Sequence, residues 1–149
     1  MTETILPFKR FDAELEAPTY AYPGDAGLDL RSSVDEVLEP FERKMIPCGI
    51  SVAIPTGHAG LVIPRSGLAA KHGISIVNAP GLIDSGYRGE LKVILVNLDA
   101  HTPFTIARGD RIAQLVVIET PVVSLSEADE LSETDRGTGG FGSSGISNS

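Results

Sequence analysis

The segment Leu91-Lys92-Val93-Ile94-Leu95-Val96-Asn97 is apolar on both faces of an extended backbone, and Lys92 is its only charged residue. The segment Arg111-Ile112-Ala113-Gln114-Leu115-Val116-Val117-Ile118 is similar, with Gln114 as its one interior polar side chain. Runs of this kind predict strands that are buried between two layers of structure. Because the chain has few aromatic residues, such apolar faces also indicate contact with another copy of the chain.

Shorter strands are predicted on either side of these two. Ile50-Ser51-Val52-Ala53-Ile54 alternates between apolar and small or polar residues, and Gly60-Leu61-Val62-Ile63 stops at a proline. Turn signals recur at intervals of about 8–12 residues, which is typical of a β-sandwich or barrel. Helical pattern is limited to two short turns, at 66–72 and 126–134. We therefore expect an all-β fold, an antiparallel jelly-roll sandwich.

Composition divides the chain into two parts. Residues 1–124 carry the predicted strands and form the expected core, and residues 125–149 form a flexible, Gly/Ser-rich C-terminal arm. The 149 residues are 42% hydrophobic but only 5% aromatic, and tryptophan is absent. The core is therefore expected to consist of Val, Ile, Leu and Ala side chains.

Charge and cysteine content narrow the classes of function. The formal net charge of −8 argues against a general affinity for the nucleic-acid backbone, but local arginines or a cation can still bind a small anion. No apolar stretch approaches the ~20 residues of a membrane span, and no secretion signal is recognisable. Cys48 is the only cysteine, so an internal disulfide is excluded and a cytoplasmic protein is expected.

Two polar clusters precede the buried segments. In Gly24-Asp25-Ala26-Gly27-Leu28-Asp29-Leu30, the two carboxylates share a face of an extended chain and suit a hard cation; the alternative is an ordinary acidic turn. In Pro64-Arg65-Ser66-Gly67-Leu68-Ala69, Ser66 precedes a helical turn and forms an anion site with Arg65; the alternative is a simple N-cap.

A third cluster spans Asn78 to Glu90 and is the richest. Asn78 offers the paired donor and acceptor that reading a pyrimidine edge requires, Asp84 suits a water-holding base, and Tyr87 suits packing on a sugar. A fourth cluster runs from Arg108 to Leu115, where the interior amide of Gln114 needs a partner.

The arm ends in Arg136-Gly137-Thr138-Gly139-Gly140-Phe141-Gly142-Ser143-Ser144-Gly145. Glycine N–H groups and Arg136 suit phosphate oxygens, and Phe141 offers a flat face for a base. This composition is typical of a mobile lid for a nucleotide, and the alternative is a disordered terminus. A dinucleotide-binding loop is excluded because no helical segment follows the glycines.

A zinc site is not expected, because His58, His72, His101 and Cys48 show no ligand spacing. Any cation is expected to be bound by oxygen, with Mg²⁺ on the phosphates of the substrate as the natural choice.

Taken in this order, the five segments resemble the five motifs of the trimeric deoxyuridine 5'-triphosphate nucleotidohydrolases (dUTPases), over roughly residues 20–146. The departures are small: Leu82 and Ser144 stand where threonine is common in the family. The resemblance implies a jelly-roll homotrimer with active sites at the subunit interfaces, each closed by a C-terminal arm. It implies hydrolysis of dUTP to dUMP and pyrophosphate with Mg²⁺, which keeps uracil out of DNA and supplies dUMP for thymidylate synthesis.

The resemblance also implies residue roles. Asp84 would hold the water that attacks the α-phosphorus and would accept a hydrogen bond from the sugar 3′-OH, and Tyr87 would leave no room for a 2′-OH. Asp29 would hold Mg²⁺ through water. The other substrate-binding residues fall into groups for uracil and its surroundings (Asn78, Gly81, Leu82, Ile83, Lys92), for phosphates (Arg65, Ser66, Gly67, Gln114), and for the arm (Arg136, Phe141, Gly142, Ser143, Ser144).

Two other functions remain open. A related dCTP deaminase would share the jelly roll, but it needs a deaminating glutamate where the third cluster offers Asp84 and Tyr87. A non-catalytic trimeric module that senses a nucleotide or a protein partner would not need an intact Asp84 or a complete arm.

Overall fold

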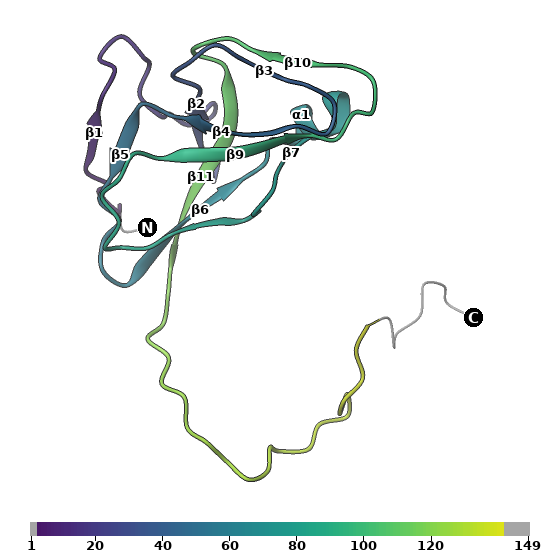
Figure 1. The fold of residues 1–149 in the computed structure, drawn as a ribbon. Helices are drawn as coiled ribbons and strands as arrows, with labels where there is room; N and C mark the ends of the chain where they lie inside the picture. The colour runs from purple at the N-terminus through teal and green to yellow at the C-terminus, as the bar shows by residue number, and fades with distance from the viewer. Residues whose placement is uncertain (1–2, 142–149) are drawn as a thin grey trace.

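The computed structural model describes residues 3–141, and these residues form a β-rich core from which a long arm extends (Figure 1). The elements, in chain order, are β1 (Phe8–Arg10), β2 (Leu28–Arg31), β3 (Glu36–Leu38), β4 (Arg43–Pro47), β5 (Ile50–Val52), β6 (His58–Ile63), α1 (Ser66–His72), β7 (Ile74–Ile76), β8 (Gly81–Ile83), β9 (Lys92–Asn97), β10 (Phe104–Ile106) and β11 (Arg111–Glu119). Of the helices in this part of the chain, none has the length and apolar character that crossing a membrane requires.

The strands form antiparallel sheets, which confirms the expected all-β fold class. A four-stranded sheet has the order β2-β11-β6-β8 and a three-stranded sheet the order β4-β9-β7, while β1 pairs with β5 and β3 with β10. Many neighbours are distant in sequence, as in the pairing of β2 with β11. This crossing of non-consecutive strands is typical of a jelly roll.

The two apolar segments form interior strands of the two larger sheets, but the predicted burial on both faces is incomplete, since Val116 is half-buried and Ile118 is 38% exposed. In β9 the side chains of Val93 and Leu95 are 1% exposed, and those of Ile94 and Val96 are half-buried. Lys92 is exposed at the start of the strand. Apart from Cys48, the buried residues of the core cluster are all Leu, Ile, Val or Ala. This confirms the aliphatic core that the composition predicts.

The ladder between β2 and β11 contains a β-bulge. Arg111 lies opposite Arg31 and Ala113 lies opposite Leu30, so Ile112 is the extra residue. Ile112 and Ala113 are both buried although they are consecutive. The extra residue reverses the direction of the side chains before it relative to those after it, because successive side chains of a strand point to opposite faces.

Two local predictions need correction. A helix does span 66–72, but its N-cap is Arg65 and has no side-chain cap hydrogen bond, so Ser66 is the first helical residue and not the cap. The predicted helical turn at 126–134 is absent, and these residues are exposed coil. A short helix away from the core has no partner on which to bury an apolar face, and isolated helices of this length are unstable.

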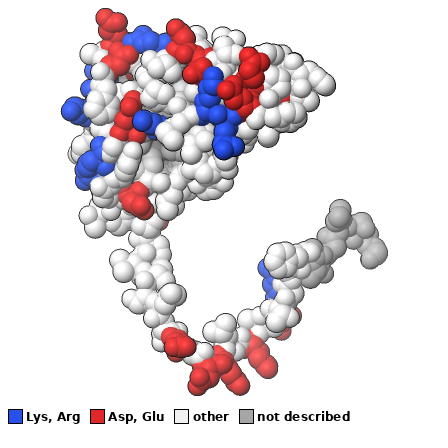
Figure 2. Space-filling view, in the orientation of Figure 1, with Lys and Arg blue, Asp and Glu red and all other residues white. Residues whose placement is uncertain are grey.

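The arm leaves the core at the end of β11 and extends away from it (Figure 1). Five acidic residues and no basic residue occur between 120 and 135, and Figure 2 shows carboxylates along this part of the arm. The first positive charge after them is Arg136.

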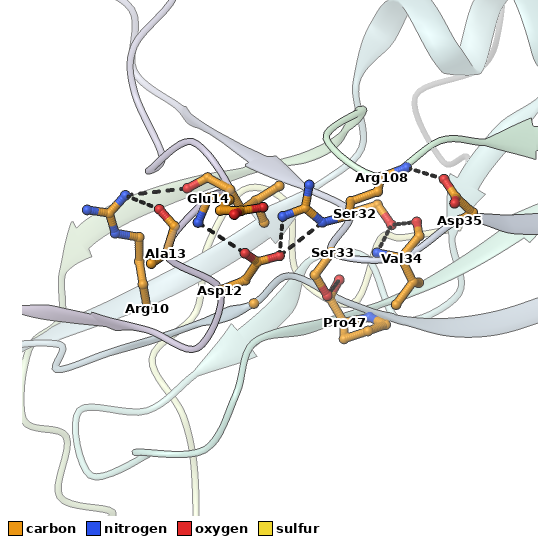
Figure 3. Close-up of polar contacts among 12 residues, drawn as sticks. Arg10, Asp12, Ala13, Glu14, Ser32, Ser33, Val34, Asp35, Pro47 and Arg108 are labelled. Atoms are coloured by element: carbon orange, nitrogen blue, oxygen red, sulfur yellow. Dashed lines mark hydrogen bonds and ion pairs between the residues drawn. The ribbon is translucent and has the colours of Figure 1, made fainter.

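An ion-pair network ties the loop after β1 to the turn before β11 (Figure 3). The guanidinium of Arg108 donates to Asp12 Oδ2, from Nε at 3.0 Å and also from Nη2. The backbone N–H of Arg108 donates to Asp35 Oδ1 at 2.8 Å. The hydrogen bond from Arg108 lowers the pKa of Asp12 below its usual value, and the same bond raises the pKa of Arg108. The network therefore fixes the turn from which β11 starts.

Candidate active site

The third cluster of the sequence lines one hollow of about 270 Å³, between β8 and the start of β9. Its apolar walls come from core residues such as Leu30, Val62 and Val93. Seven predicted site residues line it together: Asn78, Gly81, Leu82, Ile83, Asp84, Tyr87 and Lys92. We call it the nucleoside hollow. An amide, a carboxylate, a phenol and an ammonium group over an apolar base suit a flat, polar-edged ring attached to a sugar.

The loop between β8 and β9 is held by its own hydrogen bonds. The backbone N–H of Tyr87 donates to the carbonyl of Asp84 at 3.0 Å, and the hydroxyl of Tyr87 donates to the carbonyl of Glu90 at 3.0 Å. The guanidinium of Arg88 donates to the carbonyls of Ser85 and Tyr87 at 2.7 and 2.8 Å. The positions of Asp84 and Tyr87 are therefore coupled through the loop backbone.

A second hollow, of about 330 Å³, lies at α1 and β11. Its lining includes the predicted phosphate-binding residues Arg65, Ser66, Gly67 and Gln114. Two cationic or titratable side chains that were not predicted, Lys71 and His72, also line it. The helical spacing of four residues from Gly67 to Lys71 is the signal that could have identified the lysine. We call this the phosphate hollow.

Asp29 is buried beside the phosphate hollow, with 4% of its surface exposed. Its Oδ1 lies 3.3 Å from Arg65 Nε, and its Oδ2 accepts a hydrogen bond from Arg111 Nη1 at 3.3 Å. Arg65 also donates to the carbonyl of Arg111 at 3.1 Å. Gln114 lies opposite Asp29 in the ladder between β2 and β11, so the two side chains share a face of the sheet. Arg111 was not predicted as a site residue, because its partner Asp29 is 82 positions away.

The paired carboxylates of the first cluster have separate roles. Asp25 is exposed, and its carboxylate accepts a hydrogen bond from the backbone N–H of Tyr22 at 2.9 Å, as in an ordinary turn.

In the described part of the chain, no group of three or more His, Cys, Asp or Glu side chains is placed to hold a metal ion. Asp29 Oδ1 accepts no hydrogen bond from the described residues although it is buried. A buried carboxylate oxygen that, among the described residues, accepts no hydrogen bond and has only the ion pair with Arg65 fits a cation whose other ligands come from a phosphorylated substrate.

The arm residues lie apart from both hollows in this chain. Arg136 Nε donates to the carbonyl of Gly139 at 2.9 Å within the arm itself, and the side chain of Phe141 is fully exposed. The predicted residues Gly142, Ser143 and Ser144 lie outside the described residues. The structure thus gathers the predicted residues into three groups, and the two hollows share no lining residue.

Glu90 was also missed by the sequence analysis. It lines the nucleoside hollow, and its Oε1 accepts the backbone N–H of Gly49 at 3.0 Å. Cys48 lies behind it with 2% of its surface exposed, and burial, together with the charge of Glu90, raises the pKa of the Cys48 thiol to about 12. A thiol with so high a pKa is not a nucleophile at neutral pH.

Comparison with known proteins identifies the class to which this fold and these hollows belong. The profile of the dUTPase family matches residues 13–145, so the chain belongs to the dUTPase family.

Relatives and solved structures agree with this assignment. A deoxyuridine 5'-triphosphate nucleotidohydrolase of Mycobacterium sp. (strain JLS) is 58% identical over 147 residues, covering 95% of this chain and 96% of that protein. One of Rhodococcus erythropolis is 56% identical over 140 residues, covering 94% and 85%. The dUTPase of Staphylococcus bacteriophage 80alpha with dUpNHpp is 31% identical, with a TM-score of 0.88, covering 97% of this chain and 100% of that chain.

Proposed function

We propose that this enzyme of the dUTPase family performs its reaction, the hydrolysis of dUTP to dUMP and pyrophosphate, with Asp84 holding the attacking water. The observation that carries this assignment is the gathering of Asp84, Tyr87 and Asn78 in one hollow. Asp84 is exposed to the hollow, so a water molecule can reach its carboxylate. The carboxylate takes the proton of that water as the oxygen attacks the α-phosphorus, and pyrophosphate leaves.

The nucleoside hollow selects the base and the sugar. Asn78 and the backbone of Gly81, Leu82 and Ile83 read the edge of uracil, while the ring of Tyr87 packs against the deoxyribose and excludes a 2′-OH. Lys92 lies near the nucleoside. The apolar walls support these roles, because polar groups recognise a ligand most sharply where few waters compete.

The phosphate hollow binds the triphosphate. Arg65, Ser66, Gly67 and Gln114 contact its oxygens, and a guanidinium suits the fork geometry of phosphate. The reaction uses Mg²⁺, which supplies charge neutralisation on the phosphates when bound. Asp29 holds this ion through water, since its Oδ1 is the buried oxygen without a hydrogen bond. A dUTPase mutant from phage phi11 of S. aureus, 26% identical to this chain with a TM-score of 0.80, was solved with a structural Mg(II) ion.

The chain works as a homotrimer in which each site combines several subunits. In each site the nucleoside hollow of one subunit combines with the phosphate hollow of another, and the separate linings of the two hollows support this division. Large exposed apolar side chains on β4 and beyond β9, such as Met45 and Leu98, supply surface for such a contact. Residues 1–124 form the core, and residues 125–149 form the arm. Arg136, Phe141, Gly142, Ser143 and Ser144 then close over a site on a neighbouring subunit.

We place the enzyme in the cytoplasm, and its single cysteine, which lies buried in the core, supports a reducing compartment. Its net charge of −8 disfavours nucleic acid and anionic membrane surfaces as partners.

The test is release of pyrophosphate from dUTP, dTTP, dCTP and UTP, each with and without Mg²⁺. We expect release from dUTP that depends on Mg²⁺, with the other three nucleotides rejected. Release of ammonia from dCTP would favour a deaminase instead. Binding of dUTP without pyrophosphate release in Mg²⁺ would favour a sensor.

A further inference from the structure

The ring of Tyr87 lies directly against the backbone of Gly89. A Cβ added at Gly89 would lie 2.5 Å from Cζ and 2.9 Å from Cε2 of Tyr87, and closer still to its hydroxyl oxygen. Real Cβ atoms essentially never come this near to other heavy atoms. Any side chain at residue 89 therefore displaces the ring.

Backbone conformation does not account for glycine at this position. The glycines with positive φ in the described chain are Gly24, Gly49, Gly57, Gly73, Gly109 and Gly137, and Gly89 is not among them. Alanine can adopt the φ of residue 89 without the strain of the left-handed region. What the position requires is the absence of a side chain beneath Tyr87.

The other end of the ring is also held. The hydroxyl of Tyr87 donates to the carbonyl of Glu90, and the carboxylate of Glu90 in turn accepts the N–H of Gly49, next to the buried Cys48. The adjoining residue, Leu91, is 3% exposed, and its N–H donates to the carbonyl of Ile50 in β5. The acceptor of the Tyr87 hydroxyl is thus attached to the core, although the ring itself is 45% exposed.

We propose that Gly89 is a positioning residue for sugar selection, and that it acts by letting the Tyr87 ring lie flat on the loop with its hydroxyl on the Glu90 carbonyl. The proposal rests on the assignment of Tyr87 to the deoxyribose made above. A ring held in this position leaves no space beside C2′ of the sugar, so a ribose 2′-OH would clash with it. A displaced ring opens space in which a 2′-OH fits, while the water-holding carboxylate of Asp84 remains in place.

The experiment compares kcat/KM for dUTP and for UTP in the full chain with Mg²⁺. In Gly89→Ala we expect the ratio of the two values to fall about tenfold or more, the size of effect that a single shape contact gives in a binding pocket. The matched control is Gly86→Ala in the same loop, because Gly86 has no positive φ and an added Cβ there meets nothing within 4 Å. The control is expected to keep the wild-type ratio.

A double-mutant cycle separates positioning from general damage to the loop. Tyr87→Ala removes the ring and lowers the ratio by itself, and Gly89→Ala in that background is expected to cause no further loss. A wild-type ratio in Gly89→Ala, or an equal loss in both backgrounds, overturns the proposal.

Tyr87→Phe provides a second measurement that leaves the loop backbone unchanged. It removes the hydrogen bond to the Glu90 carbonyl while keeping the ring, and we expect a smaller fall in the dUTP to UTP ratio. An unchanged ratio in Tyr87→Phe overturns the part assigned to Glu90. If Gly89→Ala does not fold, Tyr87→Phe remains as the test of whether the ring must be held in place, and an unchanged ratio then overturns the whole proposal. Absence of dUTP hydrolysis in the wild type would overturn the proposed function itself, whereas normal selective hydrolysis with an unaffected Gly89→Ala overturns only the present inference.

Discussion

Asp84 is the residue on which the proposed chemistry depends. In Asp84→Asn the shape of the side chain is kept, but an amide cannot take a proton from water at neutral pH. We expect kcat for dUTP to fall by about 10²-fold or more, the usual contribution of a positioned general base, with little change in the unfolding temperature. Glu39→Gln, an exposed carboxylate in the turn between β3 and β4, is the control and should keep the wild-type kcat. Near-normal turnover in Asp84→Asn would show that another group holds the water.

Cys48 gives a chemical test of the core at the same scale. Its pKa of about 12 leaves only about one thiol in 10⁴ ionised at pH 8, and the side chain is also buried. We expect no reaction with a thiol reagent at pH 8 in the folded protein and one equivalent per chain after unfolding in denaturant. Rapid labelling of the folded protein would mean that the region around Gly49 and Glu90 opens readily.

Site residues were predictable where they are close together in sequence. Asn78, Asp84 and Tyr87 were identified from one short stretch of sequence, and the structure places them in one hollow, with β8 between Asn78 and Asp84. Arg111 and Glu90 were missed because their partners, Asp29 and Gly49, are 82 and 41 positions away. Such contacts depend on strand order, which the local pattern of residues does not specify.

At the scale of elements, the loop after β1 clamps the turn before β11 through Asp12 and Arg108. Because Arg108 lowers the pKa of Asp12 in the folded protein, the pair stabilises the fold above the pKa of the unfolded chain, 3.8 for this group. That contribution is lost as the pH falls through the lower, folded pKa. We expect Asp12→Asn to have a slightly lower unfolding temperature than the wild type at pH 7, and the difference to shrink as the pH falls below 3.8 and through the lower, folded pKa.

The control for the clamp is Asp129→Asn on the arm, which forms no described ion pair and should change the unfolding temperature at neither pH. An equal difference for Asp12→Asn at both pH values would mean that the ion pair is not the cause.

The elements themselves were largely predictable, with two instructive exceptions. The apolar runs at 91–97 and 111–118 became β9 and β11 because each lies inside a sheet and buries one face in the core. The bulge at Ile112 was not predicted, since it depends on the register with β2. The helical turn at 126–134 was predicted wrongly, because propensity alone does not stabilise a segment outside the core.

At the scale of the whole molecule, the arm should be separable from the core. A chain ending at Asp135 lacks the proposed lid but retains every strand found in residues 3–141 and both hollows. We expect its unfolding temperature to match that of the full chain and its kcat/KM for dUTP to fall by about 10²-fold, since an open site admits bulk water. Full activity in the shortened chain would remove the arm from the mechanism.

Assembly across subunits predicts recovery of activity by mixing. Asp84→Asn chains keep the arm and chains ending at Asp135 keep Asp84, so each alone should be nearly inactive. Refolding them together in equal amounts should restore up to about one quarter of the sites, those that combine an intact Asp84 with a neighbour's arm. Activity that never exceeds the sum of the separate preparations would mean that each subunit closes its own site.

The bulge at Ile112 has a consequence for how the length of the chain can vary. Arg111 and Gln114 are three positions apart, so in a regular strand their side chains would point to opposite faces of the sheet. Both nevertheless lie on the face of Asp29, because the bulge inserts Ile112 between them. Replacing Ile112 by another apolar residue keeps that count. Deleting it reverses the phase of every residue on one side of the gap, so either Arg111 or the alternating core residues from Leu115 onward face the wrong way. Natural variation can therefore change the identity of the residues in this stretch but not their number.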